Sequence, residues 1–519
     1  MATRANRQTL FDPGRVDNAG QAMCAKRAAP IPTTGADSGW GPRRAQEARL
    51  RQLELLLHEP REDVVALEIE RAVLLAAINR REDAKLAFVG ILRKFPTHFS
   101  ALNEFGALLT DMGAIDAACR VYSEAILHHP GNPMGHVNLA NLLLRANKHE
   151  DARRHYEAAL QIDPDHATAH QGLGAVLADL GERADAREHF RKGFRQHAIS
   201  TLPYRGDKAP LQLLQLVSSG GGNIPTSLLL DDMRYQTTIL VADHFDASAG
   251  LPPHRLIFNA IGDADLCAEA LEVASRLVAQ TAVPVINDPK AVLKTGRIEN
   301  TVRLRGVGGV KTARTMAVAR KLLAGPDGAD ALAGRGFVFP VLLRSPGYHT
   351  GRNFSLVRQA ADLCEAVAAL PGEELLVIEH LNARGKDGNA RKYRVMIIDG
   401  RLYPLHLAIS QDWKVHYFTS DMAANPEHRL EEAEFLEDMP AVLGEKAMAA
   451  LAGIGNVLGL DYAGVDFALD DDGKVLLFET NATMVIAKPA DDPRWAYRHR
   501  AIEKALDAVA AMIATRTAA

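Results

Sequence analysis

The chain has 519 residues, of which 47% are hydrophobic and 24% charged, and its formal net charge is −4 at pH 7. This length allows about three domains, and the composition is that of an ordinary globular protein. The slightly negative net charge argues against a general binder of nucleic acid or of membrane surfaces, so we expect neither as a partner.

The four cysteines are isolated, with no paired spacing: Cys24, Cys119, Cys267 and Cys364. They predict neither a zinc site nor a disulfide framework, and they fit a reducing compartment best. We expect no apolar run to approach the roughly 20 residues that span a bilayer. Residues 1–44 lack the apolar core of a signal peptide, contain several prolines and show no periodicity. We therefore expect a disordered tail over 1–44 and a cytoplasmic protein.

From residue 63 the sequence repeats with a period of 34, marked by Pro96, Pro130 and Pro164. Small residues, alanines and aromatic residues recur in the same phase. The small residues are Ala72, Gly106, Ala140 and Gly174, the alanines are Ala84, Ala118, Ala152 and Ala186, and the aromatic residues are Phe88, Tyr122, Tyr156 and Phe190. This pattern predicts helix–turn–helix units in which small residues allow close helix contact and an aromatic ring fills the gap.

The repeated pattern resembles the tetratricopeptide repeat (TPR) family. Over 45–200 it predicts four units, at about 63–96, 97–130, 131–164 and 165–198. A helix from Gln46 to Leu57 is expected to cap the array, because end repeats need a polar outer face. The resemblance implies a helical solenoid whose groove binds a protein or peptide partner.

Several histidines fall close together in this region: His128, His129, His136, His155, His166 and His170. A metal site would need them to converge from several helices. We expect surface histidines instead.

After about Pro210 short apolar runs alternate with helical stretches, which predicts an α/β region over 209–290. Strands are expected at 211–217, 238–241, 255–261 and 283–287, with a helix near 266–280. They predict a small open parallel sheet with glycine turns at the ends of its strands, where ligands usually bind. The segment Gly220–Gly222 either presents backbone N–H groups to an anion or is a flexible turn.

Positively charged residues and glycines lie at the ends of several elements predicted over 291–515. Arg297 begins a helix, Arg344 ends a strand over 337–344, and Glu379 lies at the end of a strand over 375–380. The loop after Arg344 contains Gly347, His349 and Gly351. A hairpin follows, with Lys392 and Arg394 at the start of its first strand and 402–408 as its second.

The most informative stretch is a second hairpin, in which Asp466 lies on one strand and Glu479 and Asn481 on the other. The Asp470–Gly473 segment between them is a turn signal. Residues i and i+2 on a strand point to the same face, so Glu479 and Asn481 face the same way and Asp466 can join them. Three hard oxygen donors on a rigid sheet suit Mg²⁺. An acidic hairpin facing solvent is the alternative for this stretch taken alone.

The ordered set of these elements resembles the ATP-grasp superfamily over about 210–490. The resemblance implies a multidomain protein: an α-helical TPR solenoid, then α/β structure comprising a sheet domain ahead of the nucleotide site at 209–290 and an α+β ATP-grasp domain at 291–515. It also implies ATP and Mg²⁺ as cofactors. A substrate carboxylate would be activated as an acylphosphate with release of ADP, and an amine or thiol would then displace phosphate.

In that scheme Arg297 and Arg344 hold phosphates under a flap formed by Gly347 to Gly351, including His349. Glu379 lies at the adenine and ribose, and Lys392 and Arg394 act as catalytic cations. Asp466, Glu479 and Asn481 bind metal. Related ligases often have Lys where this chain has Arg297 and Arg344, which preserves the charge but changes the donor geometry. The side chains of His406, Trp413, Lys414 and His416 could border a small-molecule or peptide substrate, or serve structurally.

Two other functions fit the same sequence. The protein could be a TPR scaffold with a nucleotide-binding domain that does not catalyse, although an intact set of Asp466, Glu479 and Asn481 argues against this. It could also be an ATP-grasp phosphotransferase that forms no bond to an amine. The products distinguish the three functions.

Overall fold

The structure is a computed structural model that describes residues 42–58, 64–347, 353–415 and 420–518. These residues form two compact units. The repeat unit holds residues 42–221 and 230–257, and the α/β unit holds 222–229 and 258–518. Residues 1–41 of the expected tail lie outside the described residues. The expectation is wrong for residues 42–44, which already belong to the first helix.

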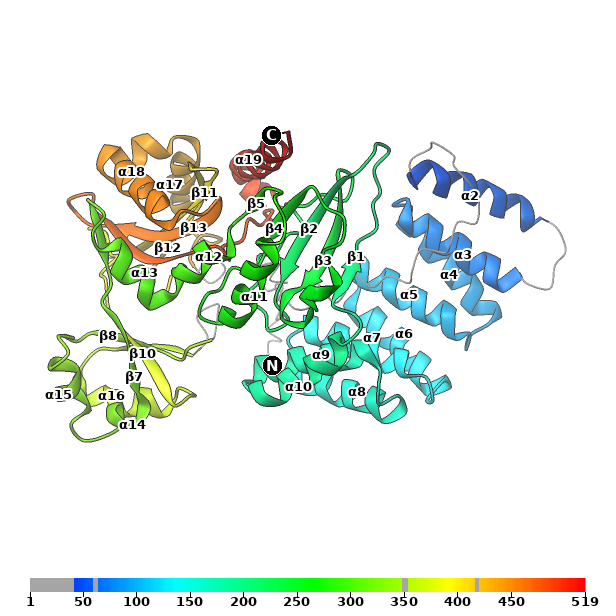
Figure 1. The fold of residues 1–519 in the computed structure, drawn as a ribbon, viewed down its shortest axis with the longest axis horizontal. Helices are drawn as coiled ribbons and strands as arrows, with labels where there is room; N and C mark the ends of the chain where they lie inside the picture. Colours follow the sequence, from blue (N-terminus) through cyan, green and yellow to red (C-terminus); the bar gives the residue numbers. More distant parts are fainter. Residues whose placement is uncertain (1–41, 59–63, 348–352, 416–419, 519) are drawn as a thin grey trace, which may run out of the picture. The chain divides into compact units, whose positions relative to one another are not determined.

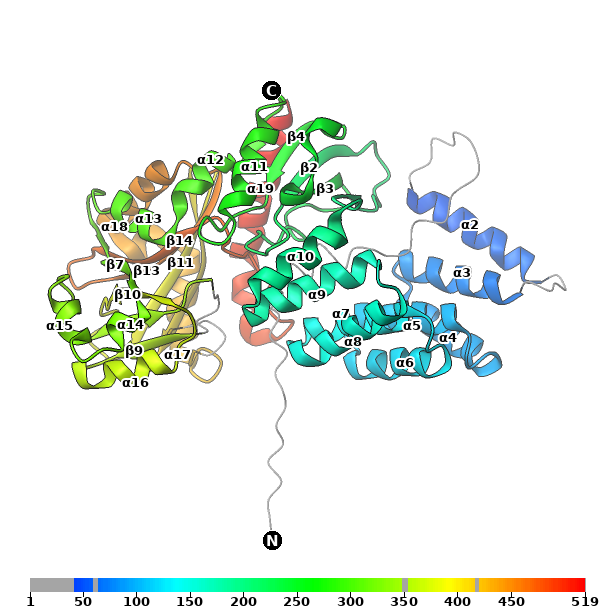
Figure 2. The same cartoon turned by 60° about the horizontal axis from the view of Figure 1, so that its bottom comes forward.

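Antiparallel helices fill residues 42–194 of the repeat unit (Figures 1 and 2). They are α2 (Pro42–Leu56), α3 (Val64–Ala77), α4 (Arg81–Lys94), α5 (Phe99–Asp111), α6 (Ile115–His128), α7 (Pro133–Arg145), α8 (His149–Ile162), α9 (Ala167–Leu180) and α10 (Arg183–Phe194). Each predicted 34-residue repeat contains one pair of these helices, from α3 and α4 to α9 and α10. The expected cap helix corresponds to α2. A TPR-like helical solenoid is therefore confirmed for the first half of the chain.

The small residues of the repeat admit the aromatic rings as predicted. A Cβ atom added to Gly174 would lie 2.7 Å from Phe190 Cδ1, and one added to Gly106 would overlap the ring of Tyr122. The four repeat aromatics, Phe88, Tyr122, Tyr156 and Phe190, are all buried. Glycine at these two positions is thus required by close helix packing.

A five-stranded sheet with the order β1-β3-β2-β4-β5 follows the helices. Its strands are β1 (Ile199–Thr201), β2 (Leu211–Val217), β3 (Tyr235–Val241), β4 (Leu256–Asn259) and β5 (Val285–Ile286), accompanied by α11 (Ala268–Val278), η1 (Ala242–His244) and η2 (Ala247–Ala249). The predicted parallel pairing holds for β2 and β3, whereas β1, which the sequence did not suggest, is antiparallel to β3. Gly221 and Gly222 have positive φ, as in a turn.

The rest of the α/β unit contains two further sheets (Figure 1). Its first part comprises α12 (Pro289–Val292), η3 (Leu293–Thr295), α13 (Arg297–Leu304), β6 (Val310–Thr312), β7 (Thr315–Ala319), α14 (Arg320–Leu323), α15 (Gly328–Ala333), β8 (Val341–Arg344), β9 (Phe354–Val357), η4 (Ala360–Asp362), α16 (Leu363–Ala368) and β10 (Glu374–Glu379). Its second part comprises β11 (Ala390–Ile398), β12 (Arg401–Ser410), α17 (Pro426–Glu437), α18 (Met439–Leu458), β13 (Tyr462–Leu469), β14 (Val475–Asn481), η6 (Pro493–Arg498) and α19 (His499–Ala518).

The smaller of these sheets has the order β7-β10-β8-β9, and all its pairs are antiparallel. Its core includes Val341, Leu343 and Val377, together with side chains from α14 to α16. The strand expected from Phe337 begins only at Val341, since Pro340 has no N–H group to donate to a ladder. This sheet carries Arg344 at the end of β8.

The larger sheet has the order β12-β11-β13-β14-β6. Both predicted hairpins are confirmed: β11 pairs with β12 and β13 with β14, each antiparallel. The two-residue turn between β11 and β12 is Asp399-Gly400, and both residues have positive φ (49° and 73°), as this hairpin turn requires. The short strand β6 joins β14 in parallel at the edge.

One apolar segment was not recognised in the sequence. Among the described residues, α18 is long and apolar enough to cross a membrane by length and composition, so the expectation that no run approaches this length is wrong. Its buried face, which includes Leu451 and Ile454, packs on β12 and β14, and it kinks at Gly444. Core helices of globular proteins pass the same test, and 33% of the apolar window of α18 is buried.

Candidate functional site

The hairpin of β13 and β14 brings the predicted acidic residues together. Asp466 lies directly opposite Glu479, and Gly464 lies opposite Asn481. The register shifts by one residue immediately after Asp466, which is a β-bulge. Asn481 Nδ2 donates to Glu479 Oε1 over 3.0 Å, so these two side chains share a face as predicted.

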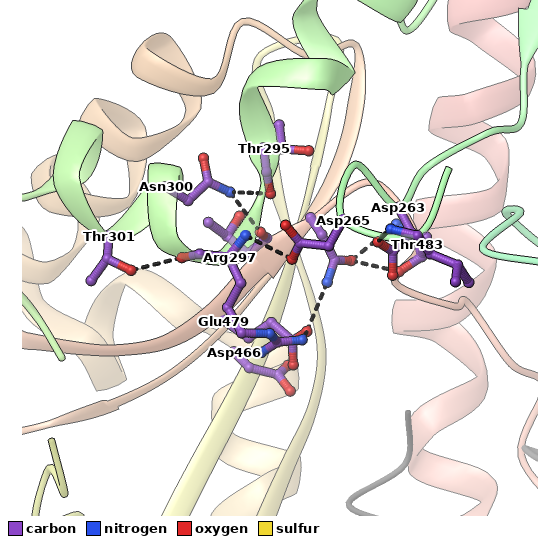
Figure 3. A network of polar contacts seen from close by, with 12 residues as sticks. Asp263, Asp265, Thr295, Arg297, Asn300, Thr301, Asp466, Glu479 and Thr483 are labelled. Atoms are coloured by element: carbon purple, nitrogen blue, oxygen red, sulfur yellow. Dashed lines mark hydrogen bonds and ion pairs between the residues drawn. The ribbon is translucent and has the colours of Figure 1, made fainter. Parts of the chain in front are cut away.

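Glu479 also binds the first residue of α13. Arg297 Nη2 donates to Glu479 Oε1 over 2.7 Å, and the Arg297 backbone N–H donates to Asp265 Oδ2 over 2.9 Å. Figure 3 shows Arg297 between these two carboxylates. At the start of α13, Arg297 therefore contacts β14 through its side chain and the loop after β4 through its backbone N–H.

Asp265 is a site residue that sequence reasoning missed. Its carboxylate accepts from the first N–H of α13 in place of a capping side chain, since Gly296 at the N-cap position has none. A Cβ on Gly296 would lie 2.8 Å from Asp265 Oδ1, so glycine is needed for this approach. Burial raises the pKa of Asp265. A signal was present, because Asp263 and Asp265 directly follow a predicted strand, where ligand sites in open sheets commonly lie.

Asp466 is held by both predicted catalytic cations. Arg394 Nε and Nη2 donate to its two oxygens over 2.6 and 2.8 Å, and Lys392 Nζ lies 3.1 Å from Oδ2. The Asp466 side chain is only 5% exposed. Burial by itself would raise its pKa, but Arg394 and Lys392 hold the pKa well below the usual range of an aspartate. The carboxylate is therefore ionised at any physiological pH.

A third arginine, Arg344, joins Arg297, Lys392, Arg394, Asp466 and Glu479 in what we call the charge cluster. Arg344 is buried at the end of β8, with its guanidinium carbon 5.9 Å from the centre of the Phe354 ring. Burial, and then the positive charge of Arg297, lower the pKa of Arg344 to about 10. Burial by itself would raise the pKa of Glu479 as well, but the positive charges of Arg297 and Arg344 lower it to about 2. Cations and carboxylates thus alternate across the ends of two sheets.

The third predicted metal ligand, Asn481, has its amide engaged. Its Oδ1 accepts from Thr483 N over 3.0 Å and from Thr483 Oγ1 over 2.9 Å. Within the described ranges, no group of three or more His, Cys, Asp and Glu side chains is arranged to hold a metal ion. The side-chain oxygens of Asp466, Glu479 and Asn481 therefore accept hydrogen bonds or ion pairs from neighbouring residues of the chain.

Other predicted residues lie at different points around this region. Glu379 contacts β6 and the residue that precedes β7. Its Oε2 accepts from Arg314 N over 3.1 Å, and Lys311 Nζ lies 3.7 Å from Oε1. Gly347 has φ 79°, as in a turn just after β8. His349, Gly351 and His416 lie outside the described residues.

Two of the possible substrate-pocket residues can be placed in detail. His406 is buried opposite Arg394 on β12, and burial followed by the charge of Arg394 keeps its pKa well below the ordinary value. It is therefore neutral. The ring of Trp413 lies 5.4 Å from that of Phe354, the same ring that Arg344 contacts.

A small cavity of about 60 Å³ opens beside Arg297 and Glu479. Its apolar lining residues include Ala313, Ile378 and Leu477. Its polar lining residues include Asp263, Asp265, Arg297, Asn300, Glu479 and Asn481. The cavity lining therefore combines apolar side chains with members of the charge cluster.

The comparisons with known proteins concern only the helical half of the chain. A family model described as tetratricopeptide repeat matches residues 133–196, which span α7 to α10. No curated protein sequence matches the chain. The chain therefore contains a TPR region, a type of domain that binds protein or peptide partners.

Solved structures similar to this chain include MamA from Desulfovibrio magneticus RS-1, with 22% identity over 29% of this chain and 85% of that one, at a TM-score of 0.26. Another structure of MamA is 20% identical over 31% of this chain and 94% of its own, at a TM-score of 0.26. A tetratricopeptide repeat protein from Parabacteroides merdae ATCC 43184 is 12% identical over 29% and 60%, at a TM-score of 0.27. TM-scores this low carry no argument, so the TPR assignment rests on the family match and on the helix packing.

Proposed function

We propose that the α/β unit is an ATP- and Mg²⁺-dependent, ADP-forming ligase of the ATP-grasp type, which joins a carboxylate to an amine or a thiol. The TPR region would bring a peptide or protein partner to it. The observation that carries this proposal is the alternation of Arg297, Glu479, Asp466 and Arg394 across α13, β14, β13 and β11. Arg344 adds a further cation from β8.

The cations fit a polyanion such as a triphosphate. Arg344 and Arg297 come from different elements, yet they are close enough for the charge of Arg297 to lower the pKa of Arg344. A site that keeps two cations close together gains when an anion binds between them, and perturbed pKa values of this kind are commonest at functional sites. Guanidinium groups also match the geometry of phosphate oxygens.

The carboxylates fit Mg²⁺ in chemical type. The low pKa values of Asp466 and Glu479 keep both groups ionised, and carboxylate and amide oxygens are the ligands that this ion takes from proteins. Asp466, Glu479 and Asn481 are the residues that would hold it. Their present partners are Arg394, Lys392, Arg297 and Thr483.

The cavity supplies a place for part of the nucleotide. Its lining includes the apolar side chains of Ala313, Ile378 and Leu477, which suit a flat base, together with Arg297 and Glu479 of the charge cluster. A volume of about 60 Å³ is well below the ~300 Å³ of a typical ligand pocket. A bound nucleotide would therefore extend from the cavity along the strand ends that carry the cations.

In this proposal, Mg²⁺-bound ATP supplies the phosphoryl group that turns a substrate carboxylate into an acylphosphate, with ADP leaving. The residues of the chain position the reactants and balance charge, as in other phosphoryl transfers. Arg297 and Arg344 hold phosphate oxygens, and Lys392 and Arg394 orient the acyl group. The amine or thiol then attacks the acyl carbon, and phosphate leaves.

A non-catalytic scaffold is the second candidate, and one observation favours it. Asp466 is bound by both oxygens to Arg394 and by one to Lys392, which is the geometry of a structural ion pair. On this alternative the TPR region carries the function and the α/β unit binds nucleotide without turning it over.

Two measurements on the full chain test the proposal. Mg²⁺ with ATP should raise the melting temperature of the chain, as a ligand that binds only the folded state does. Purified protein with Mg²⁺ and ATP should release ADP with some members of a screen of amino acids and short peptides. The Asp466→Asn and Glu479→Gln variants should lose turnover, and Asp471→Asn in the exposed hairpin turn is the matched control.

The results separate the candidates. ADP with phosphate and a new amide or thioester supports the ligase. A nucleotide-induced rise in melting temperature without turnover supports the scaffold, and a stable phosphorylated compound supports a phosphotransferase. If Mg²⁺ with ATP leaves the melting temperature unchanged, or the two variants keep full activity, the proposed nucleotide site is wrong.

A further inference from the structure

Two pairs of histidines occur at equivalent places in successive repeats. His136 on α7 and His170 on α9 are 34 residues apart, and so are His155 on α8 and His189 on α10. Each pair joins the first helix of a repeat to the second helix of the same repeat. The recurrence at the repeat period indicates that the pairing follows from the geometry of the repeat unit.

In both pairs the same ring atoms meet. His136 Nδ1 lies 3.0 Å from His155 Nδ1, and His170 Nδ1 lies 2.8 Å from His189 Nδ1. His170 is only 5% exposed, so the expectation of surface histidines is wrong for this residue. Sequence reasoning missed His189, because its partner lies on the preceding helix and the sequence alone does not align the two faces.

The environment of His170 leaves a lone pair on Nδ1. His170 Nε2 lies 2.9 Å from the carbonyl oxygen of Pro164, which can only accept a hydrogen bond. The proton of the neutral ring is therefore on Nε2. Histidines that bind metals usually donate their other ring N–H to a carbonyl or carboxylate in this way.

Burial lowers the pKa of His136, His155 and His189, and in the last two the neighbouring histidine lowers it further. A neutral imidazole is the form that binds metal ions. In each pair one ring donates its Nδ1–H to the Nδ1 of the other. When an entering ion displaces that proton, both Nδ1 lone pairs face the same point.

The separation of the two Nδ1 atoms in a pair fits two ligands in adjacent positions, about 90° apart, on one metal ion. Two ligands at about 2.0–2.1 Å from one ion, in adjacent positions of a square or an octahedron, lie about 2.9 Å apart. In a tetrahedron they would lie about 3.4 Å apart. The distances of 3.0 and 2.8 Å therefore match square-planar or octahedral coordination more closely.

We propose that the pairs His136/His155 and His170/His189 each bind one divalent transition-metal ion, of the type of Ni²⁺ or Cu²⁺, and so link the two helices of a repeat. Imidazole nitrogen suits these ions, whereas Mg²⁺ prefers oxygen. Water completes the coordination. For the second pair, an ion has a route from solvent, because His189 lines a cavity of about 170 Å³ together with Asp185, Glu157 and Glu188.

Titration of the untagged full chain with Ni²⁺ tests the proposal, with heat as the signal. We expect two equivalents in the wild type, one in His155→Gln, one in His189→Gln and none in the double variant. Both residues are half-buried, which limits damage to the fold. His128→Gln is the matched control, because His128 lies on α6 beside Glu124 and should leave both equivalents in place.

A second measurement does not depend on the variants folding. The electron paramagnetic resonance spectrum of wild-type protein with Cu²⁺ should show coordination by two imidazole nitrogens. If Cu²⁺ shows no nitrogen coordination, or the double variant takes up as much Ni²⁺ as the wild type, the pairs are hydrogen-bonded packing contacts and the proposal fails. Neither result depends on nucleotide binding in the α/β unit.

Discussion

Arg297 Nη2 donates to Glu479 Oε1 over 2.7 Å, and this bond joins the first residue of α13 to β14. Both side chains remain partly exposed, at 20% and 28%. The pair lies beside a cavity, so its partners can be exchanged for those of a ligand without unfolding either element. A contact of this kind can stabilise the fold or bind a ligand, and mutation of the charge cluster can distinguish the two roles.

Replacement of Arg344 by Met should affect folding and nucleotide binding in opposite directions. Burial and the charge of Arg297 already disfavour the charged form of Arg344, so an apolar side chain of similar length should leave the melting temperature unchanged or raise it. Loss of one charge-assisted bond to phosphate should weaken ATP binding by about tenfold or more. Thermal unfolding with and without Mg²⁺ and ATP measures both effects. A fall in both the melting temperature and the affinity for ATP would mean that Arg344 is a structural cation.

Glu479→Gln should remove part of the acid sensitivity of the α/β unit. The pKa of Glu479 is lowered from 4.5 to about 2, so its stabilising charge is fully present above about pH 4.5 and is lost as the pH falls toward 2. The contribution is at most about 3 kcal/mol, because the side chain keeps some contact with water. Urea unfolding at about pH 6 and about pH 3 should show a smaller difference in the variant than in the wild type. Equal differences would contradict the lowered pKa.

Asn287→Ala should destabilise the α/β unit by about 2–4 kcal/mol, because it leaves buried backbone groups unpaired. The Asn287 side chain donates to Tyr462 O and accepts from Tyr462 N, each over 2.8 Å, and it is fully buried. Asn147→Ala is the control, since Asn147 has the same φ of 57° but is exposed. Thermal unfolding should show a small change for the control and a large one for Asn287. Equal changes would assign the effect to the backbone angle alone.

Gly174→Ala should destabilise the repeat unit by about 1–3 kcal/mol through overpacking. The added methyl group would lie 2.7 Å from Phe190 Cδ1, and Phe190 is buried. A methyl group added to Gly90 on α4 would meet none of the described residues within 4 Å, so Gly90→Ala should be neutral or stabilise by up to about 1 kcal/mol. Opposite signs in circular dichroism melts are the expected result. A loss of stability in both variants would argue against close packing as the cause.

The sequence predicted best what depends on neighbours along the chain. The 34-residue period located each helix pair, because the ring of Phe190 and the glycine that faces it, Gly174, recur with the repeat. The hairpin that bears Asp466 and Glu479 was predicted because its turn residues and the apolar runs on either side are local signals. The assignment of Asp466, Glu479 and Asn481 to a metal stays a prediction.

The features that the sequence did not reveal depend on contacts between distant segments. The position of Asp265 after a predicted strand is a local signal for a site, but its contact with the start of α13, 32 residues later, is not. Asn287 ends a predicted strand, and its contact with Tyr462 lies 175 residues away in the sequence. The strand β6 has only three residues, too few for a period to be visible. His189 faces His170 only because two helices pack side by side.

The strand order β12-β11-β13-β14-β6 has a consequence for the order in which the chain can fold during synthesis. The sheet that carries Asp466 and Glu479 combines residues from 310 to 481, so it cannot close until residue 481 has left the ribosome. The helix pairs contact mainly their neighbours in sequence and are complete by Phe194. Structure made of local contacts forms fast, and the N-terminal parts of a chain generally fold first. The nascent chain can therefore engage a partner through its repeats before the residues of the charge cluster have been made.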